Sequence, residues 1–256
     1  MEKCLFTKLK GSVNNNNLEL FGYIRIKVLA GGDAVLYISM SSDVTIKTSN
    51  NVKLVVSGVE YDTYTYASGN FVSITARSKD SNDGFIFLDG KYSTSKYLNI
   101  TSDNAYSIID FADVKFLTSL TTLSGVKAQG ELSNLSSLIN IRQLSFPNNN
   151  DDIYGDISSL SGLTSLVNLR MYSQNVTGEL KNIANLANIE TVDVRSSKVF
   201  GSIEDFADLL APNKNNNDVV TVFCSAHITY NGKFVGNTHS AIITFNGSGG
   251  YNVVVQ

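Results

Sequence analysis

The sequence predicts a β-rich, multi-domain protein with an N-terminal antiparallel β-sandwich, a short solenoid of repeats and C-terminal β-hairpins. Three observations predict this fold class. Segments that alternate apolar and polar residues fill both ends of the chain, an apolar residue recurs at every third position in the middle, and glycine and asparagine separate the segments. The 256 residues include 12 Tyr, 13 Phe and only 2 Pro, a composition typical of β-rich proteins.

Residues 1–17 are predicted to form an N-terminal arm. Leu5, Phe6 and Leu9 lie among lysines, and a run of asparagines follows them. Consecutive asparagines favour turns and extended chain over regular structure. We expect the three apolar side chains to be the assembly contacts of this arm. A floppy terminus and a simple first strand are the alternatives.

Residues 18–103 are predicted to form an all-β domain. Short segments there show the period of two that a strand with one buried face requires. Turn-forming residues such as Asn82, Asp83 and Gly84 separate them, as expected for a small antiparallel sandwich or barrel. The predicted strands are Tyr23–Val28, Val35–Met40, Val44–Lys47, Val52–Val56, Phe71–Ala76 and Phe85–Leu88.

Residues 104–210 are predicted to form the solenoid. Glycines at 130, 155, 178 and 201 restart an apolar pattern with a period of roughly 23 to 25 residues. An ordinary amphipathic helix would alternate spacings of three and four, so the constant spacing of three predicts a tight coil instead. The apolar positions run from Leu132 to Ile153, from Ile157 to Val176 and from Leu180 to Val199, and an earlier, degraded copy fits Ile108, Phe111, Val114, Leu117 and Leu120.

The run Leu169-x-Met171-x-x-Gln174-x-Val176-x-Gly178-x-Leu180 resembles the signature of leucine-rich repeats. Gln174 here, and Ser197 in the next copy, stand where the family places its ladder asparagine, which is a departure from the pattern. The resemblance covers about a hundred residues. It implies stacked coils that bury a shared core, with the flanking β segments as caps.

A solenoid of this family usually binds its partners through the outward side chains of its short strands. Arg170, Tyr172 and Arg195, with Asp193 beside them, are the best candidates because Arg and Tyr are common anchors at interfaces. The alternative is a solvated sheet face without a function. The repeat register predicts that the outward residues are Gln143, Ser145, Asn168, Arg170, Tyr172, Thr191, Asp193 and Arg195.

Residues 211–256 are predicted to return to strands. The polar run from Asn213 to Asp218 is interpreted as a linker into them. Asn231-Gly232 and Asn246–Gly250 provide the turns of two successive β-hairpins. The predicted strands are Val219–Phe223, His227–Tyr230, Lys233–Val235, Ala241–Phe245 and Tyr251–Val255.

The sequence contains no recognisable catalytic or metal-binding motif. His227 and His239 have no partner at metal-ligand spacing, no nucleophile motif is present, and Cys4 and Cys224 form no metal or redox motif. We therefore expect no enzyme, no cofactor, no metal site and no catalytic residue. A hydrolase of surface glycans, with carboxylates paired only in space, is the remaining enzymatic alternative.

Net charge and hydropathy argue against two classes of partner, nucleic acids and membranes. The formal net charge is −3 without a basic stripe, which argues against nucleic acid. No run of roughly 18 apolar residues is present, so we expect no membrane insertion. The N-terminus lacks the apolar run and cleavage site of an export signal, so we expect synthesis in a cytoplasm.

Two parts of the chain resemble proteins of tailed phages of gut bacteria. They are the opening Met1–Val13 with the asparagine tract and Leu18–Arg25, and the ending with the turn Tyr230–Lys233 and the terminal strand Gly250–Val255. This resemblance implies a virion structural protein, such as a head fibre, decoration or tail-associated component. Its partners would be other virion proteins, its own copies in a homo-oligomer, and a host-surface protein or glycan. The alternative is a bacterial leucine-rich-repeat protein, in the cytoplasm or at the cell surface, that binds another protein or a glycan.

Overall fold

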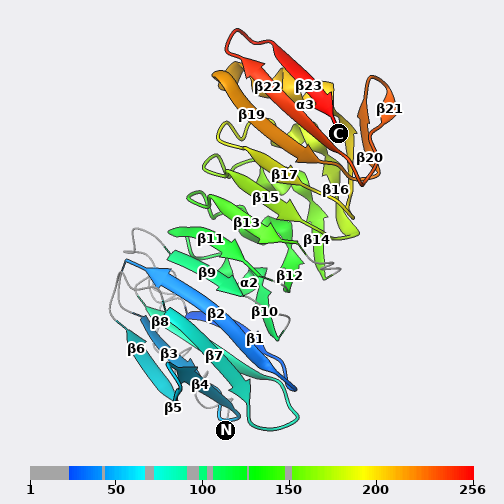
Figure 1. Cartoon of the computed structure of the whole chain (residues 1–256). Coiled ribbons are helices and arrows are strands. Elements are labelled where there is room, and N and C mark those ends of the chain that lie inside the picture. Colours follow the sequence, from blue (N-terminus) through cyan, green and yellow to red (C-terminus); the bar gives the residue numbers. More distant parts are fainter. Residues whose placement is uncertain are drawn as a thin grey trace.

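In the computed structural model, two β-sheets face each other along the length of an elongated molecule. The N-terminal segments lie at one end and the C-terminus lies near the other (Figure 1). The structure describes residues 23–41, 44–66, 72–90, 98–102, 106–125, 127–147 and 152–256. The predicted arm, with Leu5, Phe6 and Leu9, lies outside the described residues.

Sheet I has 11 strands and sheet II has 12 strands, and each sheet runs from one end of the molecule to the other. The strand order in sheet I is β21-β20-β18-β16-β14-β12-β10-β1-β8-β3-β6. The strand order in sheet II is β23-β22-β19-β17-β15-β13-β11-β9-β2-β7-β4-β5.

The first part of the chain is a two-layer antiparallel arrangement, as the alternating segments predict. Fully buried residues such as Ile26, Leu36, Ile46 and Ile74 come from both sheets and fill the space between them. In sheet I the strands are β1 (Tyr23–Val28), β3 (Val44–Thr48), β6 (Thr63–Tyr66) and β8 (Gly84–Gly90). In sheet II they are β2 (Asp33–Met40), β4 (Val52–Val56), β5 (Val59–Tyr61), β7 (Val72–Ser78) and β9 (Leu98–Ser102).

The middle of the chain forms coils, each with one strand in sheet II, one strand in sheet I and a short helical turn. Neighbouring coils pair in parallel in both sheets. The sheet II strands are β11 (Leu120–Ser124), β13 (Gln143–Phe146), β15 (Asn168–Met171) and β17 (Thr191–Asp193). The sheet I strands are β10 (Ser107–Asp110), β12 (Ala128–Glu131), β14 (Ile153–Asp156), β16 (Asn175–Glu179) and β18 (Lys198–Ser202).

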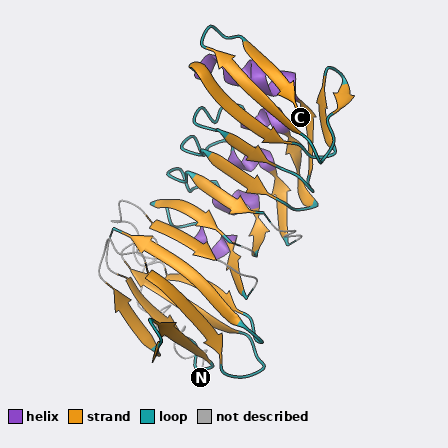
Figure 2. Ribbon diagram, in the orientation of Figure 1, coloured by secondary structure: helices purple, strands orange, loops and turns teal. Residues whose placement is uncertain are grey.

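The helical turns explain the apolar spacing of three. A 3-10 helix repeats every three residues, so residues at i and i+3 share one face. Hydrogen bonds of this type continue past the helix, as from Leu163 N to Leu160 O (3.0 Å) and from Leu166 N to Leu163 O (2.8 Å). The turns contact one another along the stack (Figure 2). The 3-10 helices are η2 (Leu132–Leu135), η3 (Ile157–Leu160) and η4 (Leu180–Ile183), and the α-helices α2 (Phe111–Val114) and α3 (Ile203–Leu210) continue the row at its two ends.

The C-terminal strands cap the stack by extending both sheets. In sheet II, β19 (Asn216–Phe223) joins in parallel, and β22 (Ser240–Asn246) and β23 (Tyr251–Val255) follow antiparallel. In sheet I, β20 (His227–Tyr230) and β21 (Lys233–Phe234) form the other predicted hairpin. The predicted linker is instead part of regular structure, because Asn213 ends η5 (Ala211–Asn213) and residues 216–218 begin β19, and the Lys214 side chain between them is buried.

The structure differs from the sequence-based expectations at two positions of the repeats. Ile109, not Ile108, faces the core in the degraded first copy, because β10 alternates inward from the buried Ser107. Gln174 is exposed, so it is not a ladder residue. The buried Ser173 takes that role, and its hydroxyl donates to Ile153 O of the preceding coil (2.5 Å) and accepts from Asn175 N (3.2 Å).

The domain boundaries drawn from composition at 103/104 and 210/211 remain a prediction. Both sheets pass across them, and buried residues from the first, middle and last strands belong to one apolar cluster. The architecture is therefore β-rich with runs of parallel strands that resemble a leucine-rich-repeat solenoid.

Candidate binding face on sheet II

The outward face of sheet II consists of side chains in register across the parallel strands. One row is Thr122, Gln143, Asn168, Thr191 and Thr221. The next row is Ser124, Ser145, Arg170, Asp193 and Phe223. Because parallel strands place equivalent residues side by side, these rows form a mostly uncharged polar surface, and the second row ends in the aromatic Phe223.

Tyr172, Asp193 and Arg195 form a hydrogen-bonded cluster on this face. The Tyr172 hydroxyl donates to Asp193 Oδ2 (2.7 Å). The Arg195 guanidinium donates to both carboxylate oxygens, from Nε to Oδ1 (3.0 Å) and from Nη2 to Oδ2 (2.8 Å), and it also donates to the Tyr172 hydroxyl oxygen. The bidentate arrangement is the strongest geometry for an arginine–carboxylate pair.

Two aromatic rings hold the Arg195 guanidinium in place. Its Cζ lies 5.2 Å from the centroid of the Tyr172 ring and 4.8 Å from that of Phe223. Both distances are within the range of a cation–π contact. Burial, together with the hydrogen bond to Asp193, raises the pKa of Tyr172 to about 12, so this phenol remains a hydrogen-bond donor at neutral pH.

The structure thus links three of the four predicted binding residues by hydrogen bonds and places the fourth, Arg170, next to them on β15. Asp193 belongs to the outward row but its side chain is only 3% exposed, because Arg195 and Tyr172 cover it. It is placed to hold Arg195 and Tyr172, not to touch a partner. Arg170 is exposed and lies beside Asp193 in register, without an ion pair among the described residues.

Phe223 is a residue of this face that the sequence did not single out. It lies on β19, beyond the last repeat, and joins the row only because β19 continues the parallel sheet. The alternation of Val219–Phe223 indicated which residues share a face, but not which strand would be their neighbour. Ring stacking on Arg195 makes it part of the candidate site.

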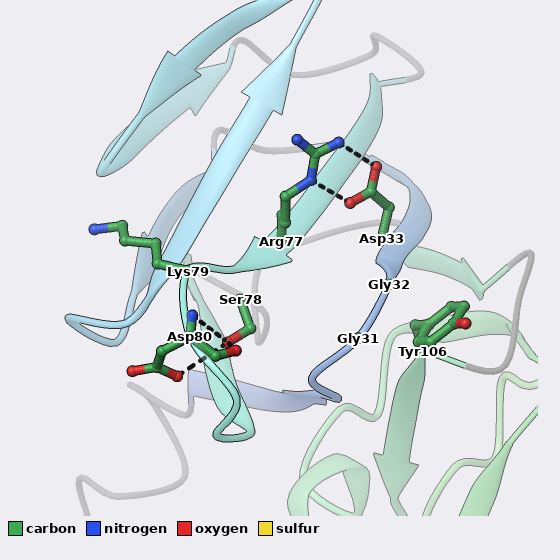
Figure 3. Close-up of a pocket in the computed structure, with 8 residues that line it drawn as sticks. All are labelled: Gly31, Gly32, Asp33, Arg77, Ser78, Lys79, Asp80 and Tyr106. Atoms are coloured by element: carbon green, nitrogen blue, oxygen red, sulfur yellow. Dashed lines mark hydrogen bonds and ion pairs between the residues drawn. The ribbon is translucent and has the colours of Figure 1, made fainter.

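A cavity of about 660 Å³ lies at the other end of the molecule, between the β1–β2 turn and the end of β7 (Figure 3). Its charged side chains already have partners. Arg77 pairs with both carboxylate oxygens of Asp33, and Lys79 Nζ donates to Asn50 O (3.0 Å). The Asp80 carboxylate accepts from Asn82 N (2.9 Å), which lowers the pKa of that carboxyl. These groups stabilise loops, and we assign the cavity no function.

Within the part of the chain that the structure describes, no group of three His, Cys, Asp or Glu side chains is arranged to hold a metal ion. Among the same residues, no helix has the length and apolar character that crossing a bilayer requires.

No protein-family model and no curated protein matches the chain. Two solved structures that it resembles are leucine-rich-repeat ectodomains of Arabidopsis thaliana receptor kinases. That of GASSHO1/SCHENGEN3, in complex with CASPARIAN STRIP INTEGRITY FACTOR 2, is 18% identical over 46% of this chain and 14% of its own, with a TM-score of 0.34. That of SOBIR1 is 20% identical over 41% of this chain and 62% of its own, with a TM-score of 0.32. The chain therefore spans less than two thirds of either ectodomain.

Proposed function

We propose that the chain is a non-enzymatic binding protein that holds another protein on the outward face of sheet II. The observation that carries this proposal is the exposed Arg170 beside the Tyr172–Asp193–Arg195 cluster, among the polar rows of sheet II. Leucine-rich-repeat folds are typically binding modules, not catalysts. A glycan is the alternative ligand, because hydroxyl and amide side chains in the outward rows also suit sugar hydroxyls.

The cluster favours a partner that carries carboxylates. Arg170 offers the fork of donors that binds a carboxylate at two points, and its own strand provides no acid for it. Arg195 is already held, so its side chain, 39% exposed, presents a rigid edge that loses little entropy on binding. The rings of Tyr172 and Phe223 add apolar area at the same place.

The test is capture from a cell-envelope extract of the host bacterium with three baits: the full chain, Arg170→Glu and Lys198→Glu. Lys198 is exposed on β18 of sheet I, so its reversal makes the same charge change away from the proposed face. We expect a protein that the unchanged chain and Lys198→Glu retain and Arg170→Glu loses. Equal retention by all three baits would contradict a role for sheet II.

We further propose that this module is displayed on a virion of a tailed phage, as a head fibre, decoration or tail-associated component. The support is the resemblance of the first residues and the terminal strand to phage proteins. In this setting the N-terminal arm, with Leu5, Phe6 and Leu9, docks onto other virion proteins. The alternative is a bacterial binding protein of the cytoplasm or cell surface.

Quantitative mass spectrometry of gradient-purified particles from the source culture tests the virion proposal. We expect a fixed copy number relative to the major capsid protein, and loss of the chain from particles when residues 1–17 are deleted. Recovery of the chain only in cell fractions would contradict the virion proposal, while leaving the binding face as it stands.

A further inference from the structure

Of the four edge strands in the described structure, β23 is the longest and the richest in valine. Natural edge strands are short, charged or interrupted by proline, because an open row of backbone groups invites another strand. The edge strand β21 has 2 residues and includes Lys233, β5 has 3 residues and includes Glu60, and β6 has 4 residues and follows Asp62. β23 has 5 residues, three of them valine, and no charge.

The free hydrogen-bonding groups of β23 follow from its register with β22. Ser240 and Gln256 exchange both backbone hydrogen bonds, at 3.0 and 2.9 Å. Since bonded and non-bonded pairs alternate in an antiparallel ladder, Val254 and Asn252 also bond to β22. Tyr251, Val253 and Val255 therefore point their N–H and C=O groups toward the open edge.

We propose that a second copy of this chain pairs with this edge, β23 against β23, about a two-fold axis at Val253. Val253 then faces Val253 of the second copy, and Tyr251 faces its Val255. Three such pairs form about six backbone hydrogen bonds. The contact is self-complementary and closes as a dimer, whereas pairing with β5 or β6 of another copy would propagate as a filament.

The surroundings of β23 suit contact with an identical surface. Residues 240–256 contain no charged side chain, so β22 and β23 themselves bring no charge to the contact. Val254 is 47% exposed and Val255 is 39% exposed, and Val254 continues the outward row of Thr221 and Ile242. Pairing covers part of the apolar surface that Ile242 and Val254 form. It leaves the rows on β13, β15 and β17 open, so it is independent of the binding proposed above.

Molar mass in solution, measured by light scattering on the full chain, tests this dimer. We expect the unchanged chain to have twice the mass of one copy. Val253→Pro removes the donor at the two-fold axis without breaking a bond to β22, and Val254→Lys keeps every donor but introduces repelling charges. Both variants are expected to have the mass of one copy.

The matched control is Val219→Lys, which places the same charge on the same face of sheet II, two strands inward, at a side chain 44% exposed. It is expected to stay dimeric. A single-copy mass for the unchanged chain, a dimeric Val254→Lys, or dissociation of Val219→Lys would overturn the proposal. If Val253→Pro does not fold by circular dichroism, Val254→Lys decides the result.

A disulfide tests the register. In the proposed pairing Asn252 lies opposite Val254 of the second copy at a non-bonded pair, where the Cα atoms are about 4.5 Å apart, a separation that a disulfide spans. Asn252→Cys with Val254→Cys, in a Cys4→Ser background, is expected to give a covalent dimer on oxidation. Asn252→Cys with Val254→Ser is expected to give none. A dimer that resists this cross-link would overturn the pairing through β23.

Discussion

Arg195→Ala is expected to destabilise the fold by about 2 to 3 kcal/mol, because it leaves the Asp193 carboxylate buried without its cation. Removing one partner of a buried ion pair typically costs about 3 to 5 kcal/mol. We expect less here, since the Tyr172 hydroxyl still donates to Asp193 and water can reach the 39% exposed site of Arg195. Urea unfolding followed by circular dichroism measures the change.

A second substitution is expected to reverse much of the loss of stability caused by Arg195→Ala. Asp193→Asn in the Arg195→Ala background takes away the buried charge, so we expect it to recover more than half of the lost stability. Arg170→Ala is the control, because Arg170 is exposed on the same face, and its effect is expected to be within about 0.5 kcal/mol. Equal losses for Arg195→Ala and Arg170→Ala would contradict a structural role for the cluster.

Gly178→Ala is expected to cost about 1 to 3 kcal/mol, because this repeat glycine has a φ of +107° that L-residues rarely adopt. An added Cβ would also overlap the Asp156 carboxylate of the preceding coil. That carboxylate caps η3 by accepting from Ser158 N (2.8 Å), so displacing it weakens η3 as well. The same unfolding measurement detects the loss.

Gly162→Ala is the matched control for this substitution. Gly162 lies in the same coil region, its φ is not positive, and an added Cβ meets no atom within 4 Å. We expect its stability to be unchanged or slightly raised, since alanine lowers the entropy of the unfolded chain. If Gly162→Ala and Gly178→Ala destabilise alike, the repeat glycines are not conformational requirements.

The local pattern of the sequence predicted the coils and their inward residues. Each helical turn sets its own apolar period, so Leu132, Leu160 and Leu180 could be placed in the core before any pairing was known. The strands at both ends could also be predicted from local pattern, because alternation alone shows which face of a strand is buried.

What the sequence could not predict depends on pairing between distant strands. β10 lies between β12 and the antiparallel β1, far upstream, and that register directs Ile109 inward in place of Ile108. Phe223 joined the binding face for the same reason. The burial of Asp193 depends on Tyr172 of the preceding coil and Arg195 of its own coil folding over it, and no spacing rule predicts this arrangement.

Binding on the outward face of sheet II is best tested by the affinity of the captured partner for Arg170→Glu and for Lys198→Glu, measured by calorimetry on folded variants of the whole chain. We expect Arg170→Glu to weaken binding by about tenfold or more, equivalent to about 1.4 kcal/mol, while Lys198→Glu binds as the unchanged chain does. Equal affinities, or a loss confined to Lys198→Glu, would contradict binding on the outward face of sheet II.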